Sequence, residues 1–196
     1  MKRLLLGLAL FFPFFAQAAL PVGEVFKPVT LSGEEGGLVK GGAWDPSSHA
    51  GKVVVLFYVD PDEKDLNEDA VEALSALPKG PIVISVAVIN LAATWLPNAV
   101  IASKLKDSQK EHPLTTYVKD LDKKLVKVWG LGDDTNSLSV IGADSKVVYS
   151  YDGKLDAGEI DQMISVLKKA VGEALAKDQS STDLDTSVPA SGYPQH

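Results

Sequence analysis

Carboxylates gather directly after an apolar run of the chain, and they are its best candidates for chemistry. Asp60, Asp62 and Asp65 follow the run that ends at Val59. Carboxylate oxygens bind divalent cations, and a close pair can act as general acid and base. One interpretation of this acidic loop (residues 60–65) is therefore a cation site or a carboxylate-dependent enzyme. The common alternative is that these acids complement the positive end of a following helix, with Asp62 as its cap.

Other familiar chemistries find no support in the residue types. The chain contains no cysteine, so it has no thiolate for disulfide exchange, peroxide reduction or metal binding. Its histidines, His49, His112 and His196, are dispersed and form no zinc-ligand spacing. The glycines form no P-loop or dinucleotide fingerprint, and no serine lies in a nucleophile elbow. We therefore expect no catalytic residue of these kinds, no metal and no cofactor, which favours a protein that is not an enzyme.

Tryptophans are the second kind of candidate. Trp44, Trp95 and Trp129 could pack in the interior, which is the usual position of such residues in a domain of this size. They could also line a groove that binds a peptide, because aromatic residues are enriched at the centres of interfaces. Trp129 is the one that we expect near the face of the acidic loop.

The first half of the chain predicts two strand-helix units that would position these residues. The apolar runs at 53–59 and 82–89 predict buried parallel strands. Apolar residues at helical spacing predict helices over 65–77 and 97–111 after them. Residues 25–31 are a further strand candidate, and the glycine pairs at 36–37 and 41–42 after it indicate turns around short strands that include 38–40.

The second half predicts a hairpin and a long helix. Strands are expected at 115–118, 138–141 and 146–151, and 125–129 is ambiguous between a strand and a helical turn. Asp156 and Glu159 form a capping-box pair before an amphipathic helix. The order predicts an α/β fold with three α/β/α layers, a mixed central sheet and an N-terminal strand extension.

The chain ends predict an exported domain with a tail. Lys2 and Arg3 precede an apolar run at 4–15, and Ala16-Gln17-Ala18 follows it. This is the pattern of a signal peptide over 1–18, cleaved between Ala18 and Ala19. We expect a periplasmic domain at 19–177 with no stable membrane insertion after cleavage. Residues 178–196 are polar and without periodicity, which predicts a disordered tail.

The charge argues against nucleic acid as a partner. The full chain carries a net charge of −7, and loss of Lys2 and Arg3 with the signal peptide makes it about −9. Arg3 is also the only arginine in the sequence. Binding to phosphate backbones depends on positive charge, and guanine is read mainly by arginine. An acidic domain without arginine is therefore a poor nucleic-acid binder.

Several segments resemble a known family. Residues 51–58 are similar to the strand that leads into the active site of peroxiredoxin-like and TlpA-like thioredoxin-fold proteins, and 140–148 to their strand-turn-strand. A closer resemblance, carried by 44–48 and 107–113, is to the YtfJ-like family of exported bacterial proteins. The resemblance spans about residues 20 to 175. It implies a thioredoxin-like fold.

This resemblance also implies where the missing redox site would lie. The C-x-x-C positions fall on Asp62 to Asp65, and the cis-proline of thioredoxins falls near Asn136. The candidate binding residues are therefore Asp60, Asp62, Asp65, Trp129 and Asn136. We expect a non-redox periplasmic protein whose former active-site face binds an unidentified protein or peptide or is functionally silent. The alternative is a carboxylate- or metal-dependent enzyme that uses the acidic loop.

Overall fold

The computed structural model of the chain describes residues 19–78 and 80–185. The predicted signal peptide, Ala18 included, and residues 186–196 of the predicted tail lie outside the described residues. Among the described helices, none is both long and apolar enough to cross a membrane.

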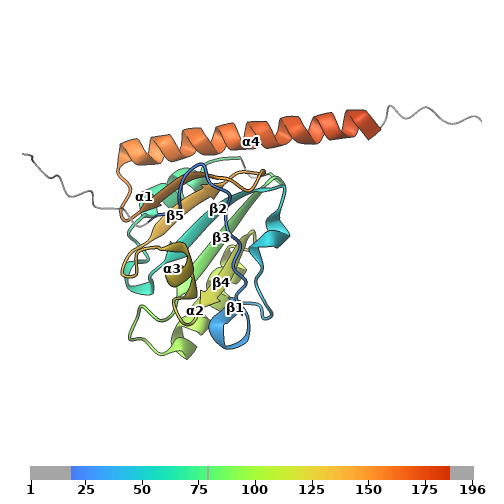
Figure 1. The fold of residues 1–196 in the computed structure, drawn as a ribbon. Coiled ribbons are helices and arrows are strands. Elements are labelled where there is room, and N and C mark those ends of the chain that lie inside the picture. The colour runs from blue at the N-terminus through green and yellow to red at the C-terminus, as the bar shows by residue number, and fades with distance from the viewer. Residues whose placement is uncertain (1–18, 79, 186–196) are drawn as a thin grey trace, which may run out of the picture.

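A six-stranded mixed sheet organises the domain (Figure 1). The strand order is β1-β4-β3-β2-β5-β6, with β2, β3 and β4 parallel to one another and the other neighbours antiparallel. The strands are β1 (Gly36–Leu38), β2 (Val53–Val59), β3 (Val83–Asn90), β4 (Thr115–Asp120), β5 (Ser137–Ile141) and β6 (Val147–Asp152). The α-helices are α1 (Glu68–Ser75), α2 (Asn98–Glu111), α3 (Lys124–Trp129) and α4 (Ala157–Asp185). The predicted mixed sheet with parallel central strands is confirmed.

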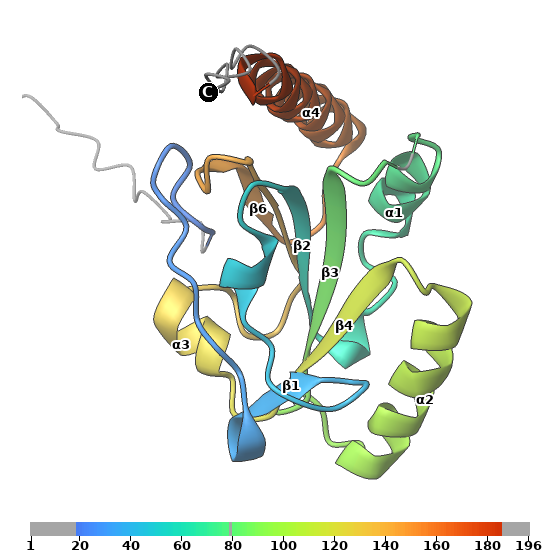
Figure 2. The ribbon, with the colours of Figure 1, turned by 90° about the vertical axis from the view of Figure 1, so that its right-hand side faces the viewer.

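The alternation of β2 divides the core into two halves. Val54, Leu56 and Tyr58 pack in a cluster that includes α3 and the segment before β1. Val53 and Val55 point the other way and pack with apolar residues of α1 and α4. Helix α2 covers the neighbouring part of that second face over β3. Helices therefore cover both faces of the sheet, which gives the predicted three layers (Figure 2).

The strand candidate at 25–31 is not a strand in the structure. Residues 25–31 form no strand and make only isolated bridges, from Val25 to Lys146 and from Leu31 to Trp44. Pro28 within this segment has no N–H for a strand ladder. The N-terminal extension is β1, which pairs with β4 and lies in the glycine-flanked segment where short strands were expected. Its Gly36 has a φ of 136°, and an added Cβ would lie 1.9 Å from the Lys119 carbonyl oxygen, so the pairing requires glycine there.

The C-terminal helix is longer than the sequence indicates. The capping box is confirmed, since the Asp156 N–H donates to Glu159 Oε2 at 2.7 Å and the Glu159 N–H to Asp156 Oδ1 at 2.9 Å. The helix then continues to Asp185, so the predicted disordered tail is wrong over 178–185. A helix that is already nucleated and packed extends at little cost through polar residues. Its end projects beyond the sheet, as Figure 1 shows.

The Asp120 side chain joins three elements at the end of β4. It is fully buried. Oδ2 accepts hydrogen bonds from the Tyr58 hydroxyl at 3.1 Å and the Leu125 N–H at 2.9 Å, while Oδ1 accepts from the N–H groups of Lys124 at 2.9 Å and Asp122 at 3.3 Å. These bonds attach the first turn of α3 and strand β2 to β4. They also explain why 124–129 is a helix, because the carboxylate satisfies N–H groups that a helix start leaves open.

We expect Asp120→Ala to lower the free energy of unfolding by about 3–5 kcal/mol, because it leaves one hydroxyl and three backbone N–H donors without their acceptor. Tyr58→Phe removes one of the four donors and should cost about 1 kcal/mol. Asp122→Ala is the control, since that side chain is exposed and should change the value by less than about 0.5 kcal/mol. Urea unfolding measures all three. A loss for Asp120→Ala no larger than for Asp122→Ala would contradict this role.

Candidate functional site

Three polar residues form a row at the carboxyl ends of the parallel strands. Asp60 follows β2, Asn90 ends β3 and Asp120 ends β4, and Asn90 pairs in register with Asp120. All three side chains are buried. In open parallel sheets, ligands bind outside these carboxyl ends, so this edge is the first place to look for a site.

Asn136 contacts the acidic loop at this edge of the sheet. Its Oδ1 accepts the Asp60 N–H at 2.9 Å, and its Nδ2 donates to the Glu63 carbonyl at 2.6 Å. The Asn136 side chain is itself buried. Asn136 thus contacts the acidic loop, as the resemblance implied. It binds the loop by both ends of its amide.

The three predicted acids of the loop, Asp60, Asp62 and Asp65, have different surroundings. Asp60 is buried, and its Oδ1 accepts the Asp62 N–H at 2.8 Å, which caps the 3-10 turn Pro61–Glu63. The Asp62 carboxylate is exposed and accepts from the Thr94 hydroxyl at 2.9 Å. Asp65 is also exposed, beside Lys64. With Glu63, which is also exposed, the loop presents three acids to solvent and uses Asp60 internally.

The predicted role of Asp62 as a helix cap is wrong. Helix α1 begins at Glu68, later than the expected start at residue 65, and its N-cap residue is Asn67. The Asn67 side chain makes no capping bond, because it donates to the Gly153 carbonyl and accepts the Leu155 N–H, both at 2.9 Å. Over residues 19–78 and 80–185, no three acids or histidines are grouped closely enough to hold a metal ion.

A second set of contacts fixes the loop before β5. Asn90 Nδ2 donates to Asp133 Oδ1 at 3.3 Å, and Lys123 Nζ lies 2.6 Å from Asp133 Oδ2. Further along, Asp152 accepts the Gly132 N–H at 2.7 Å and the Ser137 hydroxyl. The sequence analysis did not single out Asn90 or Asp133. The one sign in the sequence that Asn90 could belong to this site was its position at the end of an apolar run that predicts a strand.

The electrostatics of the edge disfavour further negative charge. Burial raises the pKa of Asp60, although the hydrogen bond from the Asp62 N–H lowers it. The nearby carboxylates of Asp62, Asp134 and Glu63 raise this pKa further. Burial likewise raises the pKa of the Tyr58 phenol, helped by Asp120. Bound positive charge would relieve this repulsion.

The raised pKa of Asp60 predicts a pH effect on stability. A carboxyl whose pKa is higher in the fold contributes stability at low pH, and this is lost as pH rises from its ordinary value of 3.8 through the raised pKa. Asp60→Asn keeps an acceptor for the Asp62 N–H and cannot ionise. As the pH rises from 3.8 through the raised pKa of Asp60, we therefore expect the melting temperature of this variant to fall less than that of the wild-type protein. Calorimetry measures both melting temperatures. Asp65→Asn, at an exposed position, is the control, and its melting temperature should depend on pH as in the wild-type protein. The same dependence for Asp60→Asn would contradict the prediction.

Trp129 does not belong to this site. It is buried in the core on the α3 face, its ring centroid lies 5.0 Å from that of Phe26, and its indole N–H donates to the Lys27 carbonyl at 2.9 Å. The expectation that it lies ready to bind a ligand is therefore wrong. The short helix α3 turns its ring inward toward the sheet.

Trp95 is the tryptophan that lies beside the acidic loop. It is 84% exposed and follows Thr94, whose hydroxyl donates to Asp62. The sequence analysis gave it no preference over the other two tryptophans. Its exposure depends on the path of the loop between β3 and α2, which the sequence pattern does not define.

The comparisons agree with this fold. Residues 32–170 match the family described as "Bacterial protein of unknown function (YtfJ_HI0045)". The chain belongs to this family. It is 24% identical over 130 residues to "Uncharacterized protein YtfJ" of Escherichia coli (strain K12), which covers 64% of this chain and 71% of that protein.

Solved structures place the family within the thioredoxin-like fold. The chain is similar to a thiol peroxidase from Chromobacterium violaceum, with a TM-score of 0.54, 16% identity, and 76% of this chain and 91% of the other covered. It is also similar to a putative thiol:disulfide interchange protein DsbE from Chlorobium tepidum, with a TM-score of 0.52, 18% identity, and 76% and 99% covered. At these identities the likeness shows the fold alone. The predicted family and fold are both confirmed.

Proposed function

We propose that this chain is a non-redox thioredoxin-fold protein of the periplasm that binds a basic stretch of polypeptide at the acidic loop. The observation that supports this most directly is Trp95, whose side chain is 84% exposed and which follows Thr94, the residue that bonds Asp62. Tryptophan is among the residues that contribute most to binding interfaces, and an exposed ring offers a large apolar surface.

Charge supports a basic partner. Asp62, Glu63, Asp65 and Asp134 are exposed on or beside the loop, and the chain carries a net charge of −7. A lysine or arginine side chain could lie over the indole while its charge faces these carboxylates. Complementary charge of this kind raises the association rate and excludes acidic partners.

Buried side chains hold the acidic loop in place before a partner binds. Asn136 holds the backbone at Asp60 and Glu63, and the Asp60 carboxylate caps the turn between them. A loop that is already ordered loses less conformational freedom when a partner binds. No observation favours the carboxylate- or metal-dependent enzyme, because Asp60 points inward while Asp65 is exposed beside Lys64.

Binding should be tested with defined peptides. We expect a labelled peptide of about ten residues, rich in lysine and free of aromatic residues, to bind the wild-type domain by fluorescence anisotropy, and an acidic peptide of equal length not to bind. Trp95→Ala should weaken binding about tenfold, as for a residue at the centre of an interface. The double variant Asp62→Asn and Asp65→Asn should weaken it and reduce its dependence on salt.

Leu114→Ala is the matched control, since this side chain is apolar, 71% exposed, and precedes the amino end of β4, away from the loop. It should bind like the wild-type protein. Equal binding by Trp95→Ala and the wild type, or by the acidic and basic peptides, would reject the proposed function.

Periplasmic export has its own test. The predicted cut before Ala19 lies next to Leu20, which is buried and donates its N–H to the Ser150 hydroxyl at 2.9 Å. A cut there would leave this anchor in the mature protein. Mass analysis of the periplasmic fraction should find an N-terminus at Ala19. A soluble protein that retains Met1 would contradict export by cleavage.

A further inference from the structure

Lys123 lies among the acids at the carboxyl edge of the sheet. Its Nζ is 2.6 Å from Asp133 Oδ2, and Asn90 Nδ2 donates to the other oxygen of that carboxylate at 3.3 Å. Asn90 ends β3, and Lys123 directly precedes α3. The chain itself therefore places an ammonium group at the edge that we assign to a basic partner.

The charges that act on Lys123 are those that would attract such a partner. The hydrogen bond to Asp133 raises the pKa of Lys123, although burial lowers it. The negative charges of Asp133, Asp134 and Asp60 raise this pKa further. Asp134 also raises the pKa of Asp60, at the start of the acidic loop. The same carboxylates thus act on Lys123 and on the loop, so an incoming ammonium group would meet Lys123 as a competitor.

The ion pair between Lys123 and Asp133 is open to solvent. The two side chains are 27% and 43% exposed, respectively. An ion pair in contact with water contributes little to stability, so it separates at small cost. A buried pair would not, because separation would leave a charge without a partner or water. The contact can therefore be exchanged for a contact with another ammonium group.

The backbone at Lys123 is unusual for a residue with a long side chain. Its φ of 53° and ψ of 34° lie in the left-handed region, which glycine and asparagine adopt more readily. Asp120 holds this turn, because its carboxylate accepts from the N–H groups of Asp122 and Lys124 on either side of Lys123. Asparagine at position 123 would therefore keep the turn and remove the ammonium group.

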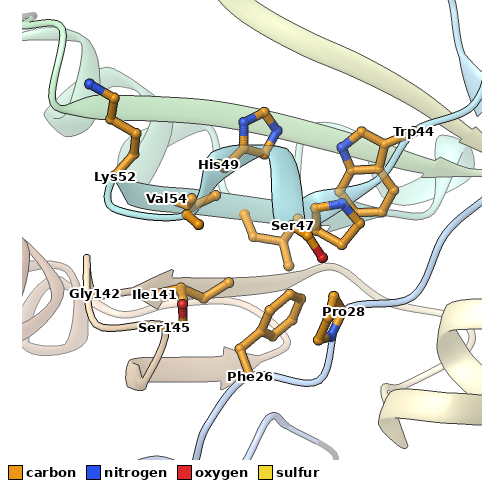
Figure 3. A pocket seen from close by; sticks show the side chains of 13 residues that line it. Phe26, Pro28, Trp44, Ser47, His49, Lys52, Val54, Ile141, Gly142 and Ser145 are labelled. Carbon is orange, nitrogen blue, oxygen red and sulfur yellow. The ribbon is translucent and has the colours of Figure 1, made fainter.

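The other end of β2 offers a basic partner no comparable contact. A cavity of about 140 Å³ lies there, and most of the side chains that line it are apolar (Figure 3). No acid is among the described residues of its lining. The indole N–H of Trp44, a lining residue, is buried without an acceptor among the described residues, and a donor does not bind a cation. A charged side chain would lose water there without gaining a counter-ion.

We propose that Lys123 is an internal competitor of the basic partner. Its ammonium group occupies Asp133 in the free protein and is replaced there by a lysine or arginine side chain of the bound peptide. This inference rests on the proposed function of the acidic loop, to which it adds Asp133 as a binding residue. Competition of this kind disfavours weakly basic partners, because a ligand must displace an ammonium group that the chain already holds in place.

A cycle of variants tests the competition with the lysine-rich peptide. Lys123→Asn should strengthen binding about threefold, the range expected for a partly exposed ion pair. Asp133→Asn keeps an oxygen for Asn90 and should weaken binding. In the double variant the gain from Lys123→Asn should disappear, because the carboxylate for which the two ammonium groups compete is absent. A gain of equal size with and without Asp133 would overturn the proposal, since loss of one positive charge alone predicts it.

Lys127→Asn is the matched control. It removes the same charge from α3, at an exposed residue whose ammonium group pairs with Asp122. The affinity for the peptide should stay close to that of the wild-type protein. A gain as large as that of Lys123→Asn would also overturn the proposal.

The titration of Lys123 gives a second measurement. An arginine-rich peptide stays charged while lysine titrates, so the pKa of Lys123 can be followed by ¹³C NMR of its Cε in the saturated complex. We expect this pKa to fall when the peptide takes its place on Asp133. An unchanged pKa would overturn the inference and leave the proposed function intact. Binding by Lys123→Asn alone would support the inference and reject binding by the wild-type protein, whereas no binding by either would reject both.

Discussion

The buried carboxylate of Asp120 is the constraint on which the α3 side of this domain depends. A carboxylate removed from water must be surrounded by donors, and Asp120 is satisfied by a hydroxyl from β2 and by backbone N–H groups at the start of α3. Strand β4, strand β2 and helix α3 can therefore adopt only one mutual arrangement without leaving a charge unpaired. That arrangement turns the Trp129 ring into the core and forms one wall of the domain.

The carboxyl edge shows how this thioredoxin-like domain, which has no cysteine, orders the loop after β2. Asn136 bonds both the N–H of Asp60 and the carbonyl of Glu63, while Asp60 caps the intervening turn. The order of the loop thus comes from an amide and a buried acid.

The proposed site at the acidic loop is charged, and Trp95 near it in the chain is exposed, so its interactions are screened by salt and suit an extended partner.

The sequence by itself determined the absence of thiol chemistry, the family, the buried central strand and the capping box of α4, because each depends on residue type or on neighbours a few positions apart. Export and the identity of the partner stay predictions. Tertiary structure alone decided that Trp129 is buried while Trp95 is exposed, that residues 124–129 are helical, and that the Trp44 indole has no partner. It also decided that Asn136 bonds Asp60, 76 positions away in the chain. These outcomes depend on contacts between distant segments, whose geometry is defined only when the sheet has formed and each buried polar group has either found a partner or been left without one.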